Sequence, residues 1–400
     1  MVSVDPKKRR RVGLFLPNFT TGGAEKQALM LALGLPRHGW DPIILAAEPQ
    51  GPLRPLVEGA GIPIHDVGAE FWHRKSSPKF WLNLFSSIAR VRQICRREKI
   101  DVLHSLLFWQ NQVALPAGLF LSGMRGGVAC GRLAMGEFKD KRPHYQRIEN
   151  LTNRFCRAMI CNSLDVYTDM RRRECHVENK GAVIPNGVDV EAFQATDPAP
   201  LREQFPALRD ARWIIGNVGN LRYHKRQDRF LEVIAALRRR HDGVKGIVVG
   251  RDLGDLENLQ GHAKSLGISE HVVFTGGLAE PAPVVRAMDV FLLTSDFEGM
   301  PNVILEAMAA SVAVVATPAG GVRQVLPEER FGFVCEPSVE TLTDAVSRLL
   351  SDDVLRRETA ARALQRVHDC FSPDALARRH AEVYSRMLSG ELLGNPLEPS

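Results

Sequence analysis

The stretch that decides the fold is SDFEGMPNVILEAMAA, residues Ser295–Ala310. It follows DVFLLT, residues 289–294, a short apolar run with polar residues at both ends, which predicts a parallel strand buried on both faces. The chain then turns at Glu298 and Gly299, and Pro301 suits the first position of a helix, where its missing N–H would have no partner anyway. A strand, a glycine turn and a helix in succession predict free N–H groups and a positive helix end at the carboxyl edge of a sheet, which suits a diphosphate.

Two carboxylates flank that predicted anion site. Glu298 lies in the turn and Glu306 in the second turn of the helix, so the two are too far apart to work as one acid–base pair. We expect them to accept hydrogen bonds from hydroxyl groups at the two ends of an elongated ligand. Taken alone, each residue also fits a surface glutamate without a ligand.

The segment EGMPNVILEA resembles the E-G-x-P-x-x-x-x-E-A signature of family 4 glycosyltransferases, which have the GT-B fold. The resemblance implies an α/β protein with two Rossmann-like, doubly wound parallel-sheet domains that face one another across a cleft. It also implies a retaining enzyme that uses a nucleotide sugar, with Glu298 on the hydroxyls of the donor sugar and Glu306 on the ribose. The backbone that would face the sugar and the phosphate belongs to Gly299, Met300 and Asn302.

Further motifs of that family follow in the second half of the chain. Arg222 and Lys225 stand in a loop after the strand-like run WIIGNVG, where two cations can neutralise a leaving diphosphate without a metal. Many relatives read G-R-L here, whereas this chain reads G-N-L, and a solvated basic loop is the alternative. Gly250 and Gly276 end two further predicted strands, and by resemblance the backbone near Gly276 reads the nucleobase. We therefore assign catalysis to Arg222, Lys225 and Glu298.

The first half carries weaker matches. GGAEK, with Gly22 and Gly23 before a predicted helix, resembles the G-G-A-E-R that faces the donor diphosphate and the acceptor in the family. His104 matches a family histidine, although a lone histidine at a strand end is commonly structural. Arg132 stands at or beside a position where many relatives carry a histidine near the donor sugar, and an arginine there can contact a phosphate or an acidic acceptor. Asn186 lies in VIPNGVD, which is similar to the I-P-N-G-V-D that lines the cleft.

The length of 400 residues predicts two domains. We expect an N-terminal acceptor-binding domain at 1–190, a proline-rich linker at 191–211, a C-terminal nucleotide-sugar domain at 212–371, a helix that packs back on the first domain at 372–390, and a disordered tail at 391–400.

The charge is unevenly distributed. Up to Asp189 the chain has 28 Lys and Arg against 17 Asp and Glu, and the remainder has 24 against 29. The basic residues of the first half lie among aromatic ones, at Lys7–Arg11, His73–Lys75 and Arg90–Lys99 beside Trp72, Trp81 and Phe85. This mixture suggests contact with an anionic membrane surface. Solvated helix faces are the alternative, and nucleic-acid binding has no helix-turn-helix, zinc-finger or RNP-like motif to support it.

Targeting and redox signals are few. Seven cysteines without a C-x-x-C pair favour reduced thiols in a cytosolic protein, with no metal expected. No apolar stretch is long enough to span a bilayer, and the basic start is a poor signal peptide. We expect a cytoplasmic protein, with peripheral contact at the membrane as an option.

These observations predict a retaining glycosyltransferase that moves a hexose from a UDP- or GDP-type sugar to a hydroxyl of a glycan or lipid-linked acceptor. Cell-surface polysaccharide or glycolipid synthesis is the process that fits. A non-catalytic nucleotide-sugar- or glycan-binding protein and a nucleotide-sugar epimerase are the alternatives. The donor sugar, the base, the acceptor and the linkage stay open.

Overall fold

The computed structural model describes residues 10–68, 78–119, 121–140, 142–278 and 280–394. They form two compact units, and the chain passes from unit 1 to unit 2 between Gly187 and Val188. Unit 2 ends at Ser372, and the chain returns to unit 1 at Pro373. Unit 1 is therefore made from two separate parts of the sequence.

Unit 1 is built on a parallel sheet that has seven strands within the described residues, in the order β3-β2-β1-β4-β5-β6-β7. Its strands are β1 (Arg10–Leu16), β2 (Trp40–Ala46), β3 (Ile64–Asp66), β4 (Val102–Ser105), β5 (Gly127–Arg132), β6 (Ala158–Cys161) and β7 (Gly181–Val183). Successive residues of a strand enter different apolar cores: Leu14 and Ile44 belong to one, Phe15 and Leu45 to the other. Both faces of the sheet therefore need a cover of helices.

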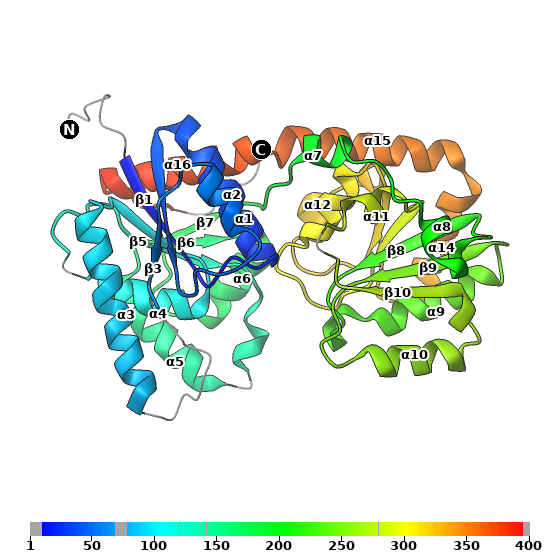
Figure 1. The fold of residues 1–400 in the computed structure, drawn as a ribbon, viewed down its shortest axis with the longest axis horizontal. Coiled ribbons are helices and arrows are strands. Elements are labelled where there is room, and N and C mark those ends of the chain that lie inside the picture. Colours follow the sequence, from blue (N-terminus) through cyan, green and yellow to red (C-terminus); the bar gives the residue numbers. More distant parts are fainter. Residues whose placement is uncertain (1–9, 69–77, 120, 141, 279, 395–400) are drawn as a thin grey trace. The chain divides into compact units, whose positions relative to one another are not determined.

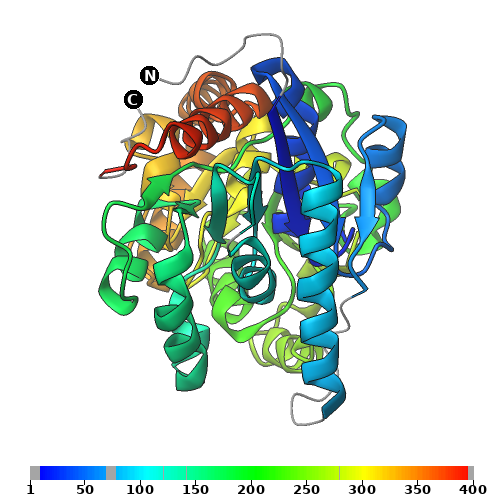
Figure 2. The same ribbon diagram turned by 90° about the vertical axis from the view of Figure 1, so that its left-hand side faces the viewer.

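Helices supply that cover (Figure 1). On one face α1 (Gly23–Gly34) packs against α16 (Pro373–Ser389), and the rings of Trp40 and Tyr384 meet edge to face with centroids 5.3 Å apart. The helices on the other face are α3 (Pro78–Arg97), α4 (Phe108–Gly118) and α6 (Leu164–Arg173). Unit 1 also contains α2 (Arg54–Gly59) and α5 (Pro143–Thr152). Figure 2 looks onto this unit, with α16 in red and α3 in cyan.

Unit 2 has a second parallel sheet, with six strands among the residues described and the order β10-β9-β8-β11-β12-β13. Its strands are β8 (Trp213–Val218), β9 (Val244–Val249), β10 (Val272–Gly276), β11 (Val290–Leu293), β12 (Ala313–Ala316) and β13 (Phe333–Val334). β11 is the predicted strand, and its four residues are buried. It lies between β8 and β12, so the residues that follow it emerge in the middle of the sheet's edge.

Helices again cover two apolar cores (Figure 1). One core contains residues of α11 (Ala282–Arg286), α12 (Asn302–Ala309), α13 (Val322–Val325) and α15 (Asp353–Cys370), and the other those of α9 (Gln227–Arg238), α10 (Leu256–Ser265) and α14 (Val339–Ser351). The two parallel sheets with helices on both faces agree with the fold class that the sequence predicts.

Two predicted segments differ from their expected form. The stretch 191–211 contains the end of α7 (Val190–Gln194) and all of α8 (Leu201–Gln204), and Leu201 and Leu208 are buried in the core of unit 2. Of the tail that we expected to be disordered, residues 391–394 are ordered, since Leu393 is buried and Gly394 bridges to Lys180. Residues 395–400 lie outside the described residues, as do Lys7–Arg9, Trp72 and His73–Lys75. In the part of the chain that is described, no helix is both long and apolar enough to cross a membrane.

Candidate active site

The site begins where β11 ends. Thr294 and Ser295 are buried, and the chain then forms a loop that leads to α12. Pro301, predicted as the first helical residue, is the N-cap with φ −75° and ψ 101°, so the helix starts one residue later. The loop therefore presents Glu298 at the carboxyl edge of the sheet.

Lys225 and Glu298 form an ion pair at this edge. Lys225 Nζ lies 2.6 Å from Glu298 Oε1, and the Ser295 hydroxyl donates to the same oxygen over 2.7 Å. Lys225 comes from the turn at Tyr223–Lys225, which follows β8. The Thr294 hydroxyl holds that turn by donating to the carbonyl oxygen of Lys225 at 3.0 Å. The structure thus brings together two of the three residues that we assigned to catalysis.

Arg222, the third, directly precedes the turn, and its side chain is exposed. Its charge acts on the neighbouring His224, whose pKa is lowered by burial first and then by the charges of Lys225 and Arg222. The Asp296 N–H donates to the carbonyl oxygen of His224 at 2.8 Å, which ties the cationic turn to the Glu298 loop. The edge therefore carries an exposed cation beside a cation that is paired with a carboxylate.

A second ion network, which we did not predict, holds Asp296 in the loop that carries Glu298. Asp296 accepts from Arg226 at 3.1 Å and from Arg229 at 2.9 Å, and Arg226 also bonds Asp228. Arg229 donates to the carbonyl oxygen of Thr294 at 2.8 Å. In the sequence, the charged residues of KRQDR are the only indication of this network. The ion pairs form because Asp296 follows β11, the strand adjacent to β8.

Glycines bring the ends of three strands together beside the cationic turn. A Cβ atom on Gly250 would lie 2.0 Å from the carbonyl oxygen of Gly219, so the backbones after β8 and β9 approach as closely as only glycine permits. Gly250 N–H donates to Gly276 over 3.0 Å, and Gly276 has φ +72°. Glycine backbone that no side chain covers, at the carboxyl edge of a parallel sheet, is a common binding place for nucleotides.

The loop after β12 packs on the loop of Glu298. Gly321 N–H donates to the carbonyl oxygen of Gly299 at 2.9 Å. A Cβ on Gly320, which has φ +55°, would lie 2.1 Å from the carbonyl oxygen of Glu298. The glycine pair therefore fixes the backbone that we expected to face a sugar and a phosphate.

The other predicted residues of this loop lie along the start of α12. Met300 is buried, Asn302 is the first helical residue, and Glu306 is half-buried in the second turn. Glu306 is on the helix whose N-terminus follows the Glu298 loop, as the spacing predicts.

In unit 1, Gly22 is the N-cap of α1 and Gly23 its first residue. The Gln27 side chain donates to the carbonyl oxygen of Gly187 and accepts from its N–H, both at 2.8 Å. Gln27, which we did not predict, thus fixes the end of the segment that contains Asn186.

His104 and Asn186 line a cavity of about 30 Å³ in unit 1. His104 Nδ1 lies 2.7 Å from the hydroxyl oxygen of Tyr384, and its Nε2 has no partner among the described residues. Burial, followed by the charge of His380, lowers the pKa of His104 well below its usual value. His104 is therefore a buried neutral histidine held by the last helix.

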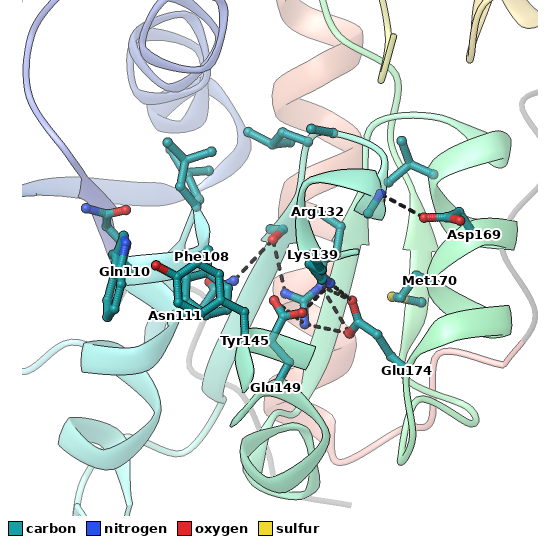
Figure 3. A pocket seen from close by; sticks show the side chains of 18 of the residues that line it. Phe108, Gln110, Asn111, Arg132, Lys139, Tyr145, Glu149, Asp169, Met170 and Glu174 are labelled. Atoms are coloured by element: carbon teal, nitrogen blue, oxygen red, sulfur yellow. Dashed lines mark hydrogen bonds and ion pairs between the residues drawn. The ribbon is translucent and has the colours of Figure 1, made fainter. Parts of the chain in front are cut away.

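Arg132 requires a correction. We expected it to contact a phosphate or an acidic acceptor, but the residue is 7% exposed. Its guanidinium is bound to protein acceptors (Figure 3). Nη2 donates to Glu174 at 2.8 Å and to Asn153 at 3.1 Å, and Nε donates to Glu174 at 3.1 Å. Although burial opposes it, the charges of Arg132 and Lys139 lower the pKa of Glu174. Arg132 is thus part of a buried ion cluster, together with Lys139, Glu149 and Glu174.

No group of three or more His, Cys, Asp or Glu side chains that could hold a metal ion is present in the described parts of the chain. The groups gathered at the carboxyl edge of the unit 2 sheet are cations, carboxylates and backbone groups of glycine residues.

Two family models match the chain in succession. The model of Glycosyltransferase Family 4 matches residues 21–192, and that of Glycosyl transferases group 1 matches residues 201–366. The two ranges contain every residue that we assigned to the site. The chain belongs to the GT-B, family 4-like glycosyltransferases.

Solved structures share the fold of this chain. Anabaena HepE in complex with UDP-glucose aligns over 94% of this chain and 99% of its own with a TM-score of 0.77 at 22% identity. WaaG, a glycosyltransferase involved in lipopolysaccharide biosynthesis, aligns over 94% and 99% with a TM-score of 0.70 at 17% identity.

Curated relatives of the chain have names from cell-surface glycan synthesis. A GDP-mannose-dependent phosphatidylinositol monomannoside mannosyltransferase is 35% identical in Mycobacterium tuberculosis and 39% in Mycolicibacterium smegmatis. These alignments cover 42% of this chain and 46% and 47% of the relatives, so the match spans about half of their length. The lipopolysaccharide core glycosyltransferase LpsE of Rhizobium meliloti is 25% identical over 90% of this chain and 95% of its own.

Proposed function

We propose that this protein transfers a sugar, with retention of anomeric configuration, from a nucleotide-diphosphate sugar to a hydroxyl of a glycan or lipid-linked acceptor. The observation that carries the proposal is the Lys225–Glu298 pair, 2.6 Å apart, at the carboxyl edge of the unit 2 sheet. A cation for a phosphate and a carboxylate for sugar hydroxyls stand there side by side. These are the two groups that a nucleotide-sugar donor requires.

Arg222 and Lys225 would neutralise the diphosphate as it leaves. Charge that develops on a leaving phosphate is stabilised best by donors already fixed in place, and Lys225 is fixed by Glu298 and Thr294. The N-terminus of α12, which begins at Asn302, would add its free N–H groups and its dipole. The acceptor hydroxyl attacks from the same face and gives its proton to the leaving phosphate oxygen, so no protein nucleophile is needed.

The donor would lie along the edge from the glycine turns to α12. Glu298 accepts from hydroxyls of the sugar and Glu306 from those of the ribose, while the backbone at Gly276 faces the base. The backbone at Gly299 and beyond would face the sugar and the phosphates. A UDP- or GDP-type donor fits the names of GDP-mannose-dependent relatives and of the HepE complex with UDP-glucose. Because two cations serve the diphosphate, we propose that no metal is required.

Cell-surface glycan synthesis is the process that the relatives' names favour. Such acceptors are often attached to lipid, and α3 carries a surface that suits a bilayer on the cytoplasmic side. Trp81, Leu82 and Phe85 on this helix are 56%, 68% and 63% exposed, and the same helix ends in Arg96 and Arg97. We propose peripheral contact with anionic lipid through this face.

Thermal unfolding with UDP, GDP and their sugars tests the donor. One nucleotide class should raise the midpoint by several degrees, and Glu306→Gln should reduce that shift more than Glu340→Gln, which changes an exposed residue of α14. Release of the nucleotide diphosphate should then require an acceptor, and NMR of the product should show a retained anomeric configuration.

Other outcomes would identify the alternatives. Stabilisation without turnover on any acceptor preparation would identify a binding protein. Conversion of the nucleotide sugar into its epimer without an acceptor, and without release of the diphosphate, would identify an epimerase. No nucleotide shift at all would reject the proposal.

A further inference from the structure

A pocket of about 270 Å³ lies in unit 1 beyond the carboxyl ends of β4 and β5. Its wall is aromatic: the rings of Phe108 and Tyr145 are stacked with centroids 4.6 Å apart, and Trp109 meets Tyr145 edge-on at 5.6 Å. Figure 3 shows the two stacked rings beside the buried charges. The proposed function gives none of these aromatic residues a role.

The charged side of the pocket is electrically balanced. Two cations, Arg132 and Lys139, face two carboxylates, Glu149 and Glu174, and all four are buried. Asp169, which also lines the pocket, is paired with Arg173 at 2.6 Å. The remaining charged residue of the lining, Arg142, is exposed and lies over the ring of Tyr145. A charged ligand would lose water on entry and find no uncompensated partner among the buried groups, which is unfavourable. The pocket therefore suits a polar but uncharged group.

Gln110 adds a buried hydrogen-bond donor to the lining of the pocket. The residue is 1% exposed and lines the pocket, and its Nε2 has no hydrogen-bond partner among the residues described. Buried polar groups in proteins are nearly always paired. An oxygen of a bound ligand would satisfy this amide.

We propose that the pocket binds one neutral pyranose ring of the acceptor, an inference that rests on the proposed function and names its substrate class. A pyranose has apolar C–H faces that pack on aromatic rings and hydroxyl oxygens that accept from an amide. The volume of about 270 Å³ is large enough for one six-membered ring. A lipid chain would fit less well, since it would leave Gln110 unpaired and lie against four charges.

Ligand-observed NMR with the full chain tests this proposal, with methyl α-D-mannopyranoside and methyl α-D-glucopyranoside as probes. For a ligand of this size we expect a Kd on the order of 1 mM for at least one of them. Gln110→Leu and Phe108→Leu should each weaken binding about three- to tenfold. Phe155→Leu, at a 48% exposed position of the same unit, is the matched control and should leave the Kd unchanged.

Gln110→Leu also separates a binding role from a structural one. Because it removes a buried donor that has no partner in the described part of the chain, its melting temperature should not fall, while its affinity for the glycoside should. Equal affinity in Gln110→Leu and the wild type would overturn the proposal. Absence of binding by either glycoside at about 50 mM, displacement by inorganic phosphate, or preferential binding of octanoate would also overturn it.

Thermal unfolding of the same samples is also measured with UDP and GDP. Failure of the pocket proposal can then be told apart from failure of the transferase proposal. Nucleotide binding without glycoside binding would reject the pyranose pocket and leave the transferase proposal standing. Glycoside binding in a protein that binds and turns over no nucleotide sugar would do the reverse.

Discussion

Lys225 Nζ lies 2.6 Å from Glu298 Oε1, although the two residues are 73 positions apart in the chain. Their side chains are 21% and 11% exposed, so the pair is partly shielded from water. A diphosphate that binds at this edge must compete with Glu298 for the ammonium group. The carboxylate therefore holds the cation in place and limits its affinity for phosphate.

Loss of both cations should abolish most of the transfer activity. Replacing Arg222 and Lys225 by Ala removes the charges that stabilise the leaving diphosphate, and we expect kcat to fall at least about 10³-fold. Steady-state kinetics with the cognate donor measure this effect. Lys264→Ala, an exposed cation on α10, should keep wild-type kinetics. A double variant with full turnover would disprove the role assigned to this turn.

Glu298→Gln should separate binding from transfer. Without the carboxylate charge, Lys225 is free for phosphate, so affinity for the nucleoside diphosphate alone should rise several-fold while sugar transfer slows. Isothermal titration and kinetics give the two values. Ser295→Ala removes one hydrogen bond to Glu298 but keeps the charge, so its nucleotide affinity should stay close to wild type. A fall in nucleotide affinity in Glu298→Gln would contradict the competition.

Removing one carboxylate of the buried ion cluster should destabilise unit 1. Glu174→Gln leaves Arg132 and Lys139 with one carboxylate between them, and we expect a cost of about 3–5 kcal/mol in the free energy of unfolding. Urea unfolding measures it, and Glu178→Gln at an exposed position should cost less than about 0.5 kcal/mol.

The cost of Glu174→Gln should also depend on pH in a defined direction. The folded-state pKa of Glu174 is lowered, so its contribution is complete above the ordinary value of 4.5 and is lost as the pH falls below it. Burial raises the pKa of Glu149 and the charge of Glu174 adds to this rise, so Glu149 titrates at a lower pH in the variant than in the wild type. The difference between wild type and variant should therefore shrink below pH 4.5. A difference that grows in acid would contradict this account.

His380 should make the protein less stable in mild acid. Burial lowers its pKa from 6.5 to about 4, so the folded state resists its protonation. The stability that follows is present above pH 6.5 and is lost toward pH 4, in total about 3 kcal/mol. His380→Asn can keep the hydrogen bond to the Leu376 carbonyl without the titration. Its melting temperature should vary less with pH over this interval than that of the wild type.

The apolar face of α3 should determine binding to membranes. Trp81→Ser combined with Phe85→Ser removes two exposed aromatic side chains, and we expect binding to vesicles of phosphatidylcholine and phosphatidylglycerol to weaken at least about tenfold. Sedimentation with the vesicles measures the effect. Val354→Ser, at a 66% exposed position in unit 2, is the control. Equally strong binding to neutral vesicles would show that electrostatic attraction to anionic lipid does not contribute to membrane binding.

The sequence predicts the two-sheet fold and the position of the Glu298 loop because both depend on local patterns. β11 is an apolar run with polar ends, and the glycines that bring strand ends together adjoin such runs. The pairing of Lys225 with Glu298 depends on β8 and β11 being neighbours, which no local pattern specifies.

The same limit explains the errors. Arg132 is neutralised by Glu174, a residue 42 positions away, so its environment cannot be inferred from its own segment. Residues 391–394 read Glu-Leu-Leu-Gly, a stretch too short to predict an element, yet Leu393 is buried in unit 1 beside α16. Tertiary contacts, and not local preference, decide both cases.

The return of the chain to unit 1 at Pro373 fixes the order in which the protein can mature on the ribosome. Residues 188–372 form one continuous unit, which can collapse as soon as it has emerged. Unit 1 begins to be synthesised first, but its core stays incomplete until α16 has followed residues 188–372 out of the exit tunnel, since Leu376, Tyr384 and Met387 are part of that core. A nascent chain that stops before α16 would therefore expose the apolar face over β1 and β4, and it is this incomplete product that chaperones and proteases would meet.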